Sequence, residues 1–163
     1  MKKLILPLIT GMLFSISVNN INAQTTCWYD SIYTYNATNL LVTKEYYYYN
    51  SNGWCNERII KDSLNGNWKN SARYLYTYDA NGNYTDIIGQ NWANNSWRNA
   101  SRELKTYNTN EDILTHNSYY WDTVASSWVV SSFQHEYFYN SNNKLIKHLQ
   151  AYFSNGVPTD SSR

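Results

Sequence analysis

In places along the chain, aromatic and polar residues alternate with a period of two. The alternation is plain in residues 67–78, where Trp68 and three tyrosines all lie on even-numbered positions. One set is Trp68, Asn70, Ala72, Tyr74, Tyr76 and Tyr78, and the other is Lys69, Ser71, Arg73, Leu75 and Thr77. Because successive side chains of a strand point to opposite faces, the pattern predicts a β-strand whose two faces carry these two sets.

A short string, Tyr-Asn/Asp-x-Asn/Thr-x, separates such segments and recurs five times. The steps between its Asn or Asp residues are 14, 29, 29 and 32 residues. Asn and Asp bond to their own backbone and tolerate positive φ, so each copy predicts a turn. The copies begin at Tyr35, Tyr49, Tyr78, Tyr107 and Tyr139.

A second string, a turn-like cluster followed by Trp, lies between these copies at residues 65–68, 94–97 and 125–128. Together the two strings predict a turn about every 14 to 15 residues. The segments between them are rich in strand formers, and no segment after the N-terminus shows a helical period. We therefore predict an all-β fold, an antiparallel meander of tandem hairpins with about nine strands. An open curled sheet, a barrel and a spiral remain alternatives.

The N-terminus has the pattern of a secretory signal. A basic start precedes an apolar run over residues 4–18, and a small residue, Ala23, follows. The run is shorter than the roughly 20 apolar residues of a membrane span. We predict a signal peptide over residues 1–23 and a β-hairpin repeat domain over 24–163, with no membrane span after cleavage. Such a protein is exported to the periplasm, the cell surface or the medium; an uncleaved anchor is the alternative.

Charge and composition narrow the range of partners. Of thirteen basic residues, the predicted signal peptide removes two, so eleven face twelve acidic residues in the exported part. No basic stripe remains for phosphate contacts, which argues against a nucleic-acid partner. The 17 Tyr and 7 Trp supply most of the large apolar side chains. The chain is therefore expected to fold on aromatic surfaces rather than around an aliphatic core.

The two cysteines, Cys27 and Cys55, both lie in the exported part. An oxidising compartment permits a disulfide between them, which would stabilise the fold by roughly 3–4 kcal/mol. Free thiols are the alternative, and two cysteines alone do not make a structural zinc site.

No motif of a catalytic or cofactor site is present. The histidines His116, His135 and His148 are dispersed, and the carboxylates are scattered. Residues 79–83 resemble part of a calcium loop, but its twelfth position is Gln90 instead of the Glu that an EF-hand requires. We therefore predict no enzymatic activity, no metal and no cofactor.

The Trp residues beside turns are the strongest candidates for binding. One turn is flanked by Trp92 and Trp97, and another by Trp121 and Trp128. Cross-strand packing explains such positions without any ligand. A platform for sugar rings and an anchor for a protein partner are the functional alternatives. For a glycan, the hydrogen-bonding partners would be Arg98, Asn94 and Asn99.

Two segments carry a resemblance to a known class of repeats. Residues 76–83 and 97–102 resemble the Tyr/Trp-rich repeats of secreted and surface proteins of Bacteroidetes-type bacteria. They are also loosely similar to the YD repeats of Rhs-type shell proteins, although only residues 76–82 have both the Asp and the Gly of that motif. The resemblance implies arrays of extended hairpins. It also implies O-glycosylation at Asp-Ser/Thr-aliphatic sites, whose candidates here are Ser31, Ser63 and Thr123.

These observations favour a non-enzymatic extracellular module for binding or adhesion, with a glycan or a surface protein as partner. The alternative is a structural stalk or shell segment of a larger exported protein, because the pattern stops within an expected strand at residues 157–163. An exported glycan-cleaving enzyme is a weaker third hypothesis. An open meander also has two sheet edges that invite self-association.

Overall fold

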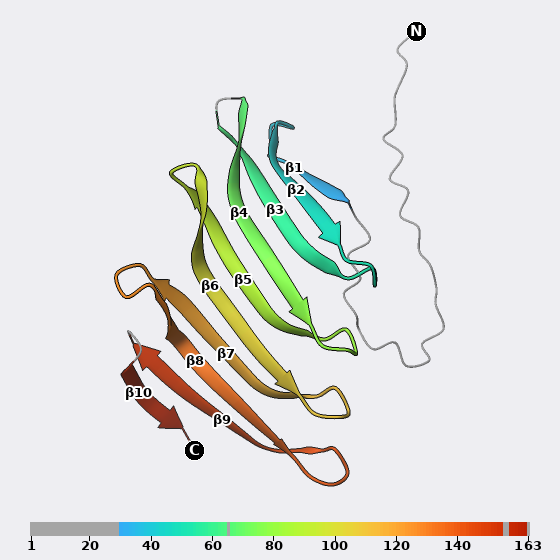
Figure 1. Cartoon of the computed structure of the whole chain (residues 1–163), viewed down its shortest axis with the longest axis vertical. Coiled ribbons are helices and arrows are strands. Elements are labelled where there is room, and N and C mark those ends of the chain that lie inside the picture. Colours follow the sequence, from blue (N-terminus) through green and yellow to red (C-terminus); the bar gives the residue numbers. More distant parts are fainter. Residues whose placement is uncertain (1–29, 65, 155–156, 163) are drawn as a thin grey trace.

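The structure is a computed structural model that describes residues 30–64, 66–154 and 157–162. Its described residues form ten β-strands in a single sheet, and each strand pairs antiparallel with its neighbour in sequence (Figure 1). The strands are β1 Ser31–Tyr35, β2 Leu41–Tyr49, β3 Cys55–Leu64, β4 Asn67–Tyr78, β5 Tyr84–Ala93, β6 Ser96–Tyr107, β7 Ile113–Asp122, β8 Ser127–Tyr139, β9 Leu145–Ser154 and β10 Val157–Ser162.

This arrangement confirms the predicted all-β antiparallel meander. The two outermost strands, β1 and β10, do not pair with each other, so the sheet stays open and does not close into a barrel. The tenth strand, β10, corresponds to the expected strand within which the sequence pattern stops, at residues 157–163. The predicted signal peptide, residues 1–23, lies outside the described residues. In the described ranges no helix is long and apolar enough to cross a membrane.

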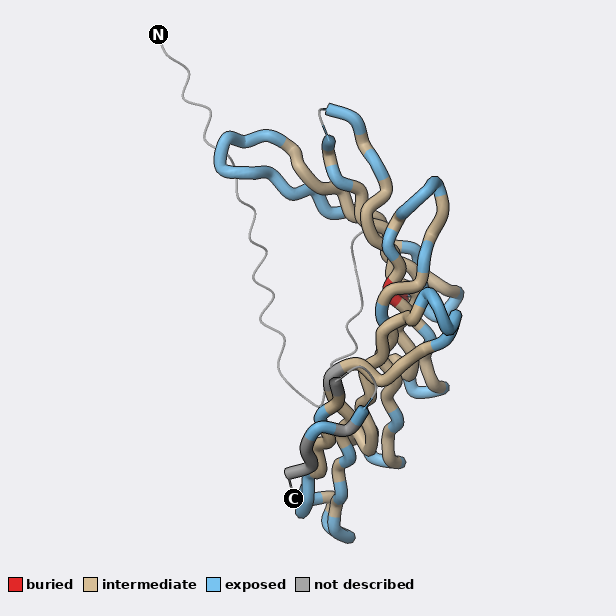
Figure 2. Tube along the Cα trace, turned by 90° about the vertical axis from the view of Figure 1, so that its left-hand side faces the viewer, coloured by how far each residue is buried: buried red, intermediate tan, exposed pale blue. Residues whose placement is uncertain are grey.

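The sheet is one layer thick and curved (Figure 2). Among the described residues the one apolar side chain that is fully buried is Cys55, with 2% of its surface exposed. Most Tyr and Trp side chains are half-buried. Without a second layer, stabilisation comes from the contacts between neighbouring side chains on each face, as the aromatic composition led us to expect.

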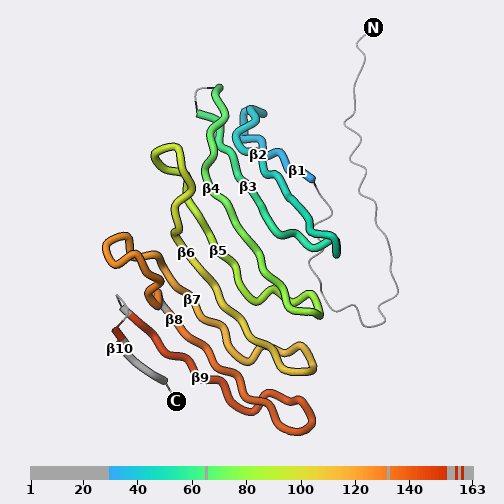
Figure 3. Tube along the Cα trace, viewed as in Figure 1, coloured from blue at the N-terminus to red at the C-terminus, as the bar shows by residue number. Residues whose placement is uncertain are grey.

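Four of the five Tyr-Asn/Asp turns lie at one end of the sheet, which we call the Asx end. They join β2–β3, β4–β5, β6–β7 and β8–β9 (Figure 3). In each turn the Asn or Asp Oδ1 accepts hydrogen bonds of 2.9 to 3.0 Å from the backbone N–H groups two and four residues ahead. The turn-forming residues are Asn50, Asp79, Asn108 and Asn140.

The fifth turn, at Asn36, has the same hydrogen bonds but joins β1 to β2 at the opposite end. In all five copies the residue three positions after the Asn or Asp has positive φ. Glycine and asparagine adopt this conformation most readily, and four of the five positions carry one of them. The five residues are Asn39, Gly53, Gly82, Glu111 and Asn143.

At the Asx end, the hydroxyl of a tyrosine that precedes a turn bonds to the first residue of the preceding strand, and this bond braces the turn. The Tyr107 hydroxyl at the end of β6 donates to the carbonyl of Tyr84, the first residue of β5, at 2.9 Å. Tyr78 donates in the same way to Cys55 at 2.7 Å. Burial raises the pKa of Tyr107 to about 12, with smaller contributions from Tyr84 and Asp79. The hydroxyl therefore stays protonated and keeps donating.

The alternation predicted for residues 67–78 is wrong at one point, because β4 contains a β-bulge. Ile60 of β3 pairs with Ala72, but the next residue, Lys61, pairs with Asn70, so Ser71 is extra. An extra residue reverses the alternation beyond it. Trp68 and Asn70 therefore share a face with Arg73 and not with the tyrosines that follow.

The two faces take their names from these residues. The Tyr face carries Tyr74 and Tyr76, and the Trp face carries Trp68 and Arg73. The same bulge occurs one hairpin later, in β6, where Ala100 is the extra residue between partners of Gly89 and Gln90. It places Trp97 and Arg102, five residues apart, on the Trp face as well.

Candidate functional site

Five tryptophans gather on the Trp face at the end of the sheet opposite the Asx end, which we call the Trp end. They flank the turns that join β3–β4, β5–β6 and β7–β8. These residues are Trp68, Trp92, Trp97, Trp121 and Trp128. The turns between them differ: positive φ occurs at Gly66 in the first, at Asn94 and Asn95 in the second, and at Ser126 in the third.

Four of the predicted binding residues form two cross-strand aromatic pairs. Trp92 and Trp97 are register partners, with ring centroids 4.9 Å apart and planes at 72°. Trp121 and Trp128 are related in the same way, at 5.0 Å and 74°. Edge-to-face pairs of this kind stabilise a sheet by about 0.5–1.5 kcal/mol each. Cross-strand packing, the alternative that needs no ligand, thus applies to these four tryptophans.

On the Trp face, three Trp rings each lie under a cation that comes from two strands earlier in the sequence. The Arg102 guanidinium lies 5.9 Å from the ring centre of Trp128 and is ion-paired with Asp86 at 2.6 Å. The hydrogen bond with Asp86 is the main cause that raises the pKa of Arg102. Arg73 repeats the arrangement over Trp97, and Lys44 lies 4.2 Å from the ring centre of Trp68. These cations cover one face of each of the three rings.

A groove of about 500 Å³ opens between the β3–β4 turn and the β5–β6 turn. Its aromatic walls are Trp68 and Trp92, and amide side chains surround them. Within the described residues, the structure shows no hydrogen bond to the side-chain amides of Asn70, Asn94 or Asn95. The lining is Trp68, Lys69, Asn70, Trp92, Ala93, Asn94 and Asn95.

The groove includes two of the predicted binding residues, Trp92 and Asn94. Asn99 has a different position, because its Oδ1 accepts a hydrogen bond of 2.9 Å from Gln90. Arg98 is exposed and pairs with Asn91 in the β5–β6 register. Of the other predicted tryptophans, Trp97 pairs with Trp92, and Trp121 and Trp128 form the pair of the β7–β8 hairpin.

Sequence reasoning missed Trp68, Asn70 and Asn95 as groove residues. A signal for the first was present, because Trp68 follows a turn in the same repeated string as Trp97 and Trp128. Its position beside Trp92 depends on the bulge at Ser71, which the sequence did not indicate.

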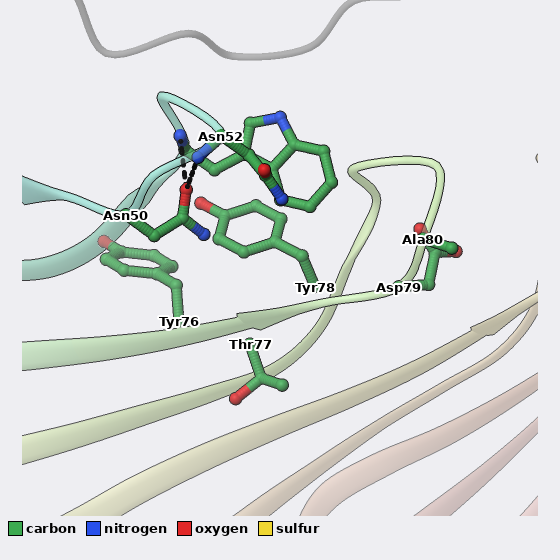
Figure 4. Close-up of a pocket in the computed structure, with 8 residues that line it drawn as sticks. Asn50, Asn52, Tyr76, Thr77, Tyr78, Asp79 and Ala80 are labelled. Atoms are coloured by element: carbon green, nitrogen blue, oxygen red, sulfur yellow. Dashed lines mark hydrogen bonds between the residues drawn. The ribbon is translucent and has the colours of Figure 1, made fainter.

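A second groove, of about 630 Å³, lies at the Asx end between successive turns (Figure 4). Its lining includes Trp54, whose ring is 5.3 Å from that of Tyr78. Here the polar atoms serve the fold. Asn50 Oδ1 accepts from two backbone N–H groups, both Asp79 oxygens accept hydrogen bonds, and the Tyr78 hydroxyl donates to Cys55. This groove offers a ligand fewer unengaged groups than the one at the Trp end.

All three histidines of the chain lie in a row on the Tyr face, across β7, β8 and β9. His135 Nδ1 is 2.7 Å from His148 Nε2, and the rings of His116 and His135 are 6.1 Å apart. His116 Nε2 in turn lies 3.1 Å from Glu103 Oε2 on β6. The sequence spacing of 19 and 13 residues hid this row, since only the strand order brings these residues together.

The described residues contain no group of three or more His, Cys, Asp or Glu that could hold a metal ion. Several carboxylates are instead engaged in ion pairs between strands. These pairs are Glu45–Arg58, Glu57–Arg73 and Asp86–Arg102, and Glu103 Oε2 lies within hydrogen-bond distance of His116 Nε2.

Two sets of sequence predictions stay predictions. Cys55 is buried at the start of β3, and Cys27 lies outside the described residues, so their disulfide is not tested. Of the three O-glycosylation candidates, Thr123 is exposed in the β7–β8 turn, while Ser31 and Ser63 are half-buried within strands.

No protein-family model and no curated protein matches this chain. The solved structures that are similar to it include three bacterial proteins. A Bacteroides fragilis NCTC 9343 protein of unknown function has a TM-score of 0.53 and 18% identity, over 74% of this chain and 90% of the other. This likeness shows the fold alone.

The other two are DUF3836 family proteins. The one from Bacteroides vulgatus ATCC 8482 has a TM-score of 0.42 and 20% identity, over 63% of this chain and 91% of its own. The one from Parabacteroides distasonis ATCC 8503 has a TM-score of 0.43 and 19% identity, over 53% and 84%. The function of the present chain must therefore be argued from its own residues.

Proposed function

We propose that the protein is a non-enzymatic, exported module that binds a glycan in the groove between Trp68 and Trp92 at the Trp end. The observation that carries the proposal is the combination of two aromatic walls with three side-chain amides that make no hydrogen bond to described residues. A flat aromatic ring suits the apolar face of a sugar ring. Amides supply both donors and acceptors for hydroxyl groups.

The volume and the polarity of the groove agree with this ligand class. About 500 Å³ lies within the 300–1,000 Å³ range usual for small-ligand sites. The side-chain amides of its lining carry no charge and suit a ligand that is rich in hydroxyl groups. Export, which the proposal requires, is predicted from residues 1–23.

A structural role in a larger exported protein is the second candidate. It is favoured by the way in which each hairpin contacts only its neighbours, because such an array extends by adding hairpins. In that case the Trp groove would be a packing surface, and removal of its amides would have no effect on any ligand.

The test is glycan-panel binding by residues 24–163, read by Trp fluorescence. Trp92→Ala is expected to abolish saturable binding. Asn94→Gly and Asn95→Gly each remove an amide where glycine fits the positive φ, so the turn is kept. Each should weaken binding about tenfold, as expected for the loss of one good hydrogen bond.

Matched controls come from the rest of the sheet. Asn39→Gly makes the same change at a positive-φ position in the β1–β2 turn, and Trp54→Ala removes a Trp at the Asx end. Both should leave binding unchanged. If no glycan binds folded protein, or if the groove variants bind as the controls do, the glycan proposal is wrong and the structural role gains support.

A further inference from the structure

The contact between His135 and His148 has an unusual geometry. The ring centres are 5.0 Å apart, the planes lie within 12° of each other, and Nδ1 of His135 is 2.7 Å from Nε2 of His148. The short nitrogen–nitrogen contact spans most of the distance between the ring centres. The two rings therefore lie edge to edge in nearly one plane, with one nitrogen directed at the other.

Such a contact requires one proton between the two nitrogens. A neutral imidazole has one N–H donor and one acceptor nitrogen, whereas an imidazolium has two donors. The hydrogen bond is present when both rings are neutral and also when one of them is charged. When both are protonated, two N–H groups face each other, the bond is lost and two positive charges repel at short range.

We propose that this histidine pair is a pH-sensitive hydrogen-bonded link between β8 and β9. It holds while the two rings carry one positive charge or none, and it opens when both are protonated. His135 pairs in register with Gln150, and His148 pairs with Tyr137. The link is therefore diagonal, because the two histidines belong to neighbouring pairs on the same face of the sheet and not to one register pair.

The surroundings on the β7 side do not neutralise a second charge on the pair. His116 lies beside His135, and its own positive charge would be balanced by Glu103. Lys105, the register partner of His116, adds a further cation, although its Nζ is bonded to the Tyr84 hydroxyl. The carboxylate of Glu103 therefore contacts His116 and not the pair of His135 and His148.

The surroundings on β8 and β9 are aromatic or neutral. Tyr137 stacks on His148, with ring centres 4.5 Å apart and planes within 4°. Gln150 carries no charge. Glu136 is the chain neighbour of His135 and so points to the opposite face, where Lys147, next to His148, also points. These neighbours favour a pair with few charges over a doubly charged one.

The direction of the pH effect follows from the state that binds more protons. Burial lowers the pKa of His135, and the charges of His148 and His116 act in the same direction. The unfolded chain then binds more protons than the folded one, so stability rises with pH. The contribution is fully present above about pH 6.5, the ordinary histidine pKa, and is lost as the pH falls below it.

The test is a pH titration of the full exported chain from pH 8 to 4.5, with NMR of the imidazole nitrogens. We expect the imidazole nitrogens of His135 to respond to pH in more than one step, because its protonation is coupled to the ring that it faces. Hydrogen exchange of the β9 amides, corrected for the intrinsic rate, should rise at least about tenfold below the lower step. Independent titration of both rings near pH 6.5, or unchanged exchange, would overturn the proposal.

Variants separate the shared proton from mere stacking. His148→Phe keeps an aromatic ring against Tyr137 but cannot share a proton, so the pH dependence of β9 exchange should disappear. His116→Phe is the matched control, because it leaves the shared proton of the pair intact. The pH dependence of β9 exchange should persist, moved to slightly higher pH because the charge of His116 no longer opposes protonation of His135. If His148→Phe retains the wild-type profile, the proposal is wrong. If that variant does not fold, the wild-type NMR titration decides alone.

Discussion

At the Asx end of the sheet one five-residue turn occurs four times, whereas the turns at the Trp end differ in length and sequence. The Asx turns share one set of backbone and side-chain hydrogen bonds, and tyrosine hydroxyls brace the inner ones. The Trp-end turns range from two residues between β5 and β6 to five between β1 and β2. Because the uniform turns at the Asx end already align successive hairpins, the turns at the Trp end can differ in length and sequence.

The two ends also differ in what their polar groups do. At the Asx end, Asn and Asp oxygens satisfy backbone N–H groups that would otherwise lack partners. At the Trp end, the side-chain amides of Asn94 and Asn95 line the groove and make no hydrogen bond to described residues. The difference teaches that the same residue type can be structural at one end and available to a ligand at the other. The bulges in β4 and β6 separate these two regions.

The largest expected effect comes from deleting Ala100, the extra residue of the β6 bulge. Without it, Trp97 would turn to the face opposite Arg102, and its contacts with Trp92 and Arg73 would be lost. We expect a loss of about 3 kcal/mol in the free energy of unfolding, from aromatic and cation–π contacts together. Urea unfolding and the near-UV circular dichroism of the Trp pairs measure the two effects.

Deletion of Val124 is the control for shortening the chain. This residue is 94% exposed at the tip of the β7–β8 turn, and its loss should cost about 1 kcal/mol or less. If both deletions have the same effect, the bulge does not control which face carries Trp97.

The next largest effect is expected at the Asx end, from Asp79→Ala. This change removes the acceptor of two backbone hydrogen bonds, those from Asn81 and Asn83. The expected cost is about 2 kcal/mol in the free energy of unfolding. Glycan binding by the folded variant should not change, because the groove lies at the other end.

Asp79→Asn provides the matched control, since the other four turns use Asn at this position. It should change stability by about 0.5 kcal/mol or less. A destabilisation equal to that of Asp79→Ala would show that the charge of Asp79, and not its acceptor oxygen, stabilises the turn.

A smaller effect is expected for Tyr107→Phe, which removes the hydroxyl that braces an Asx turn. The expected cost is about 1 kcal/mol at neutral pH. The wild-type pKa of about 12 lies above the ordinary value of 10.0, so this contribution is full below pH 10 and falls as the pH rises toward 12. Thermal unfolding between pH 7 and 12 should show this loss in the wild type, and the variant should lack it.

Tyr33→Phe controls for the loss of any hydroxyl, because Tyr33 is 49% exposed on the edge strand β1. It should leave both stability and the alkaline profile unchanged. If Tyr107→Phe behaves in the same way, the hydroxyl does not brace the turn.

Much of the fold could be predicted because its signals are local. The Tyr-Asn/Asp string determines a turn within five residues, and the spacing of turns sets the number and length of the strands. Residues that act through distant partners could not be predicted. The histidine row needs strands β7, β8 and β9 in order, and Trp68 and Trp92 line one groove only because β4 pairs with β5.

The candidate site was predicted in part for the same reason. Trp92 and Asn94 flank a turn that is visible in the sequence, so their place at one end of a hairpin followed directly. Asn99 was predicted to bond a ligand, but Gln90 on the neighbouring strand engages it. Register pairs decide which amides remain available, and register depends on bulges that have no clear local signature.

By itself the sequence determined that this chain forms tandem antiparallel hairpins with aromatic faces, because turn chemistry and period-two alternation act over a few residues. Only the tertiary structure decided that the sheet stays open, which face each Trp occupies, and which polar groups are left without partners. Those outcomes depend on an extra residue in a strand and on neighbours from other strands, such as Trp68 and Trp92, which lie 24 residues apart in sequence. Each bulge reverses the alternation beyond it, so one residue decides on which face of the sheet a Trp side chain lies.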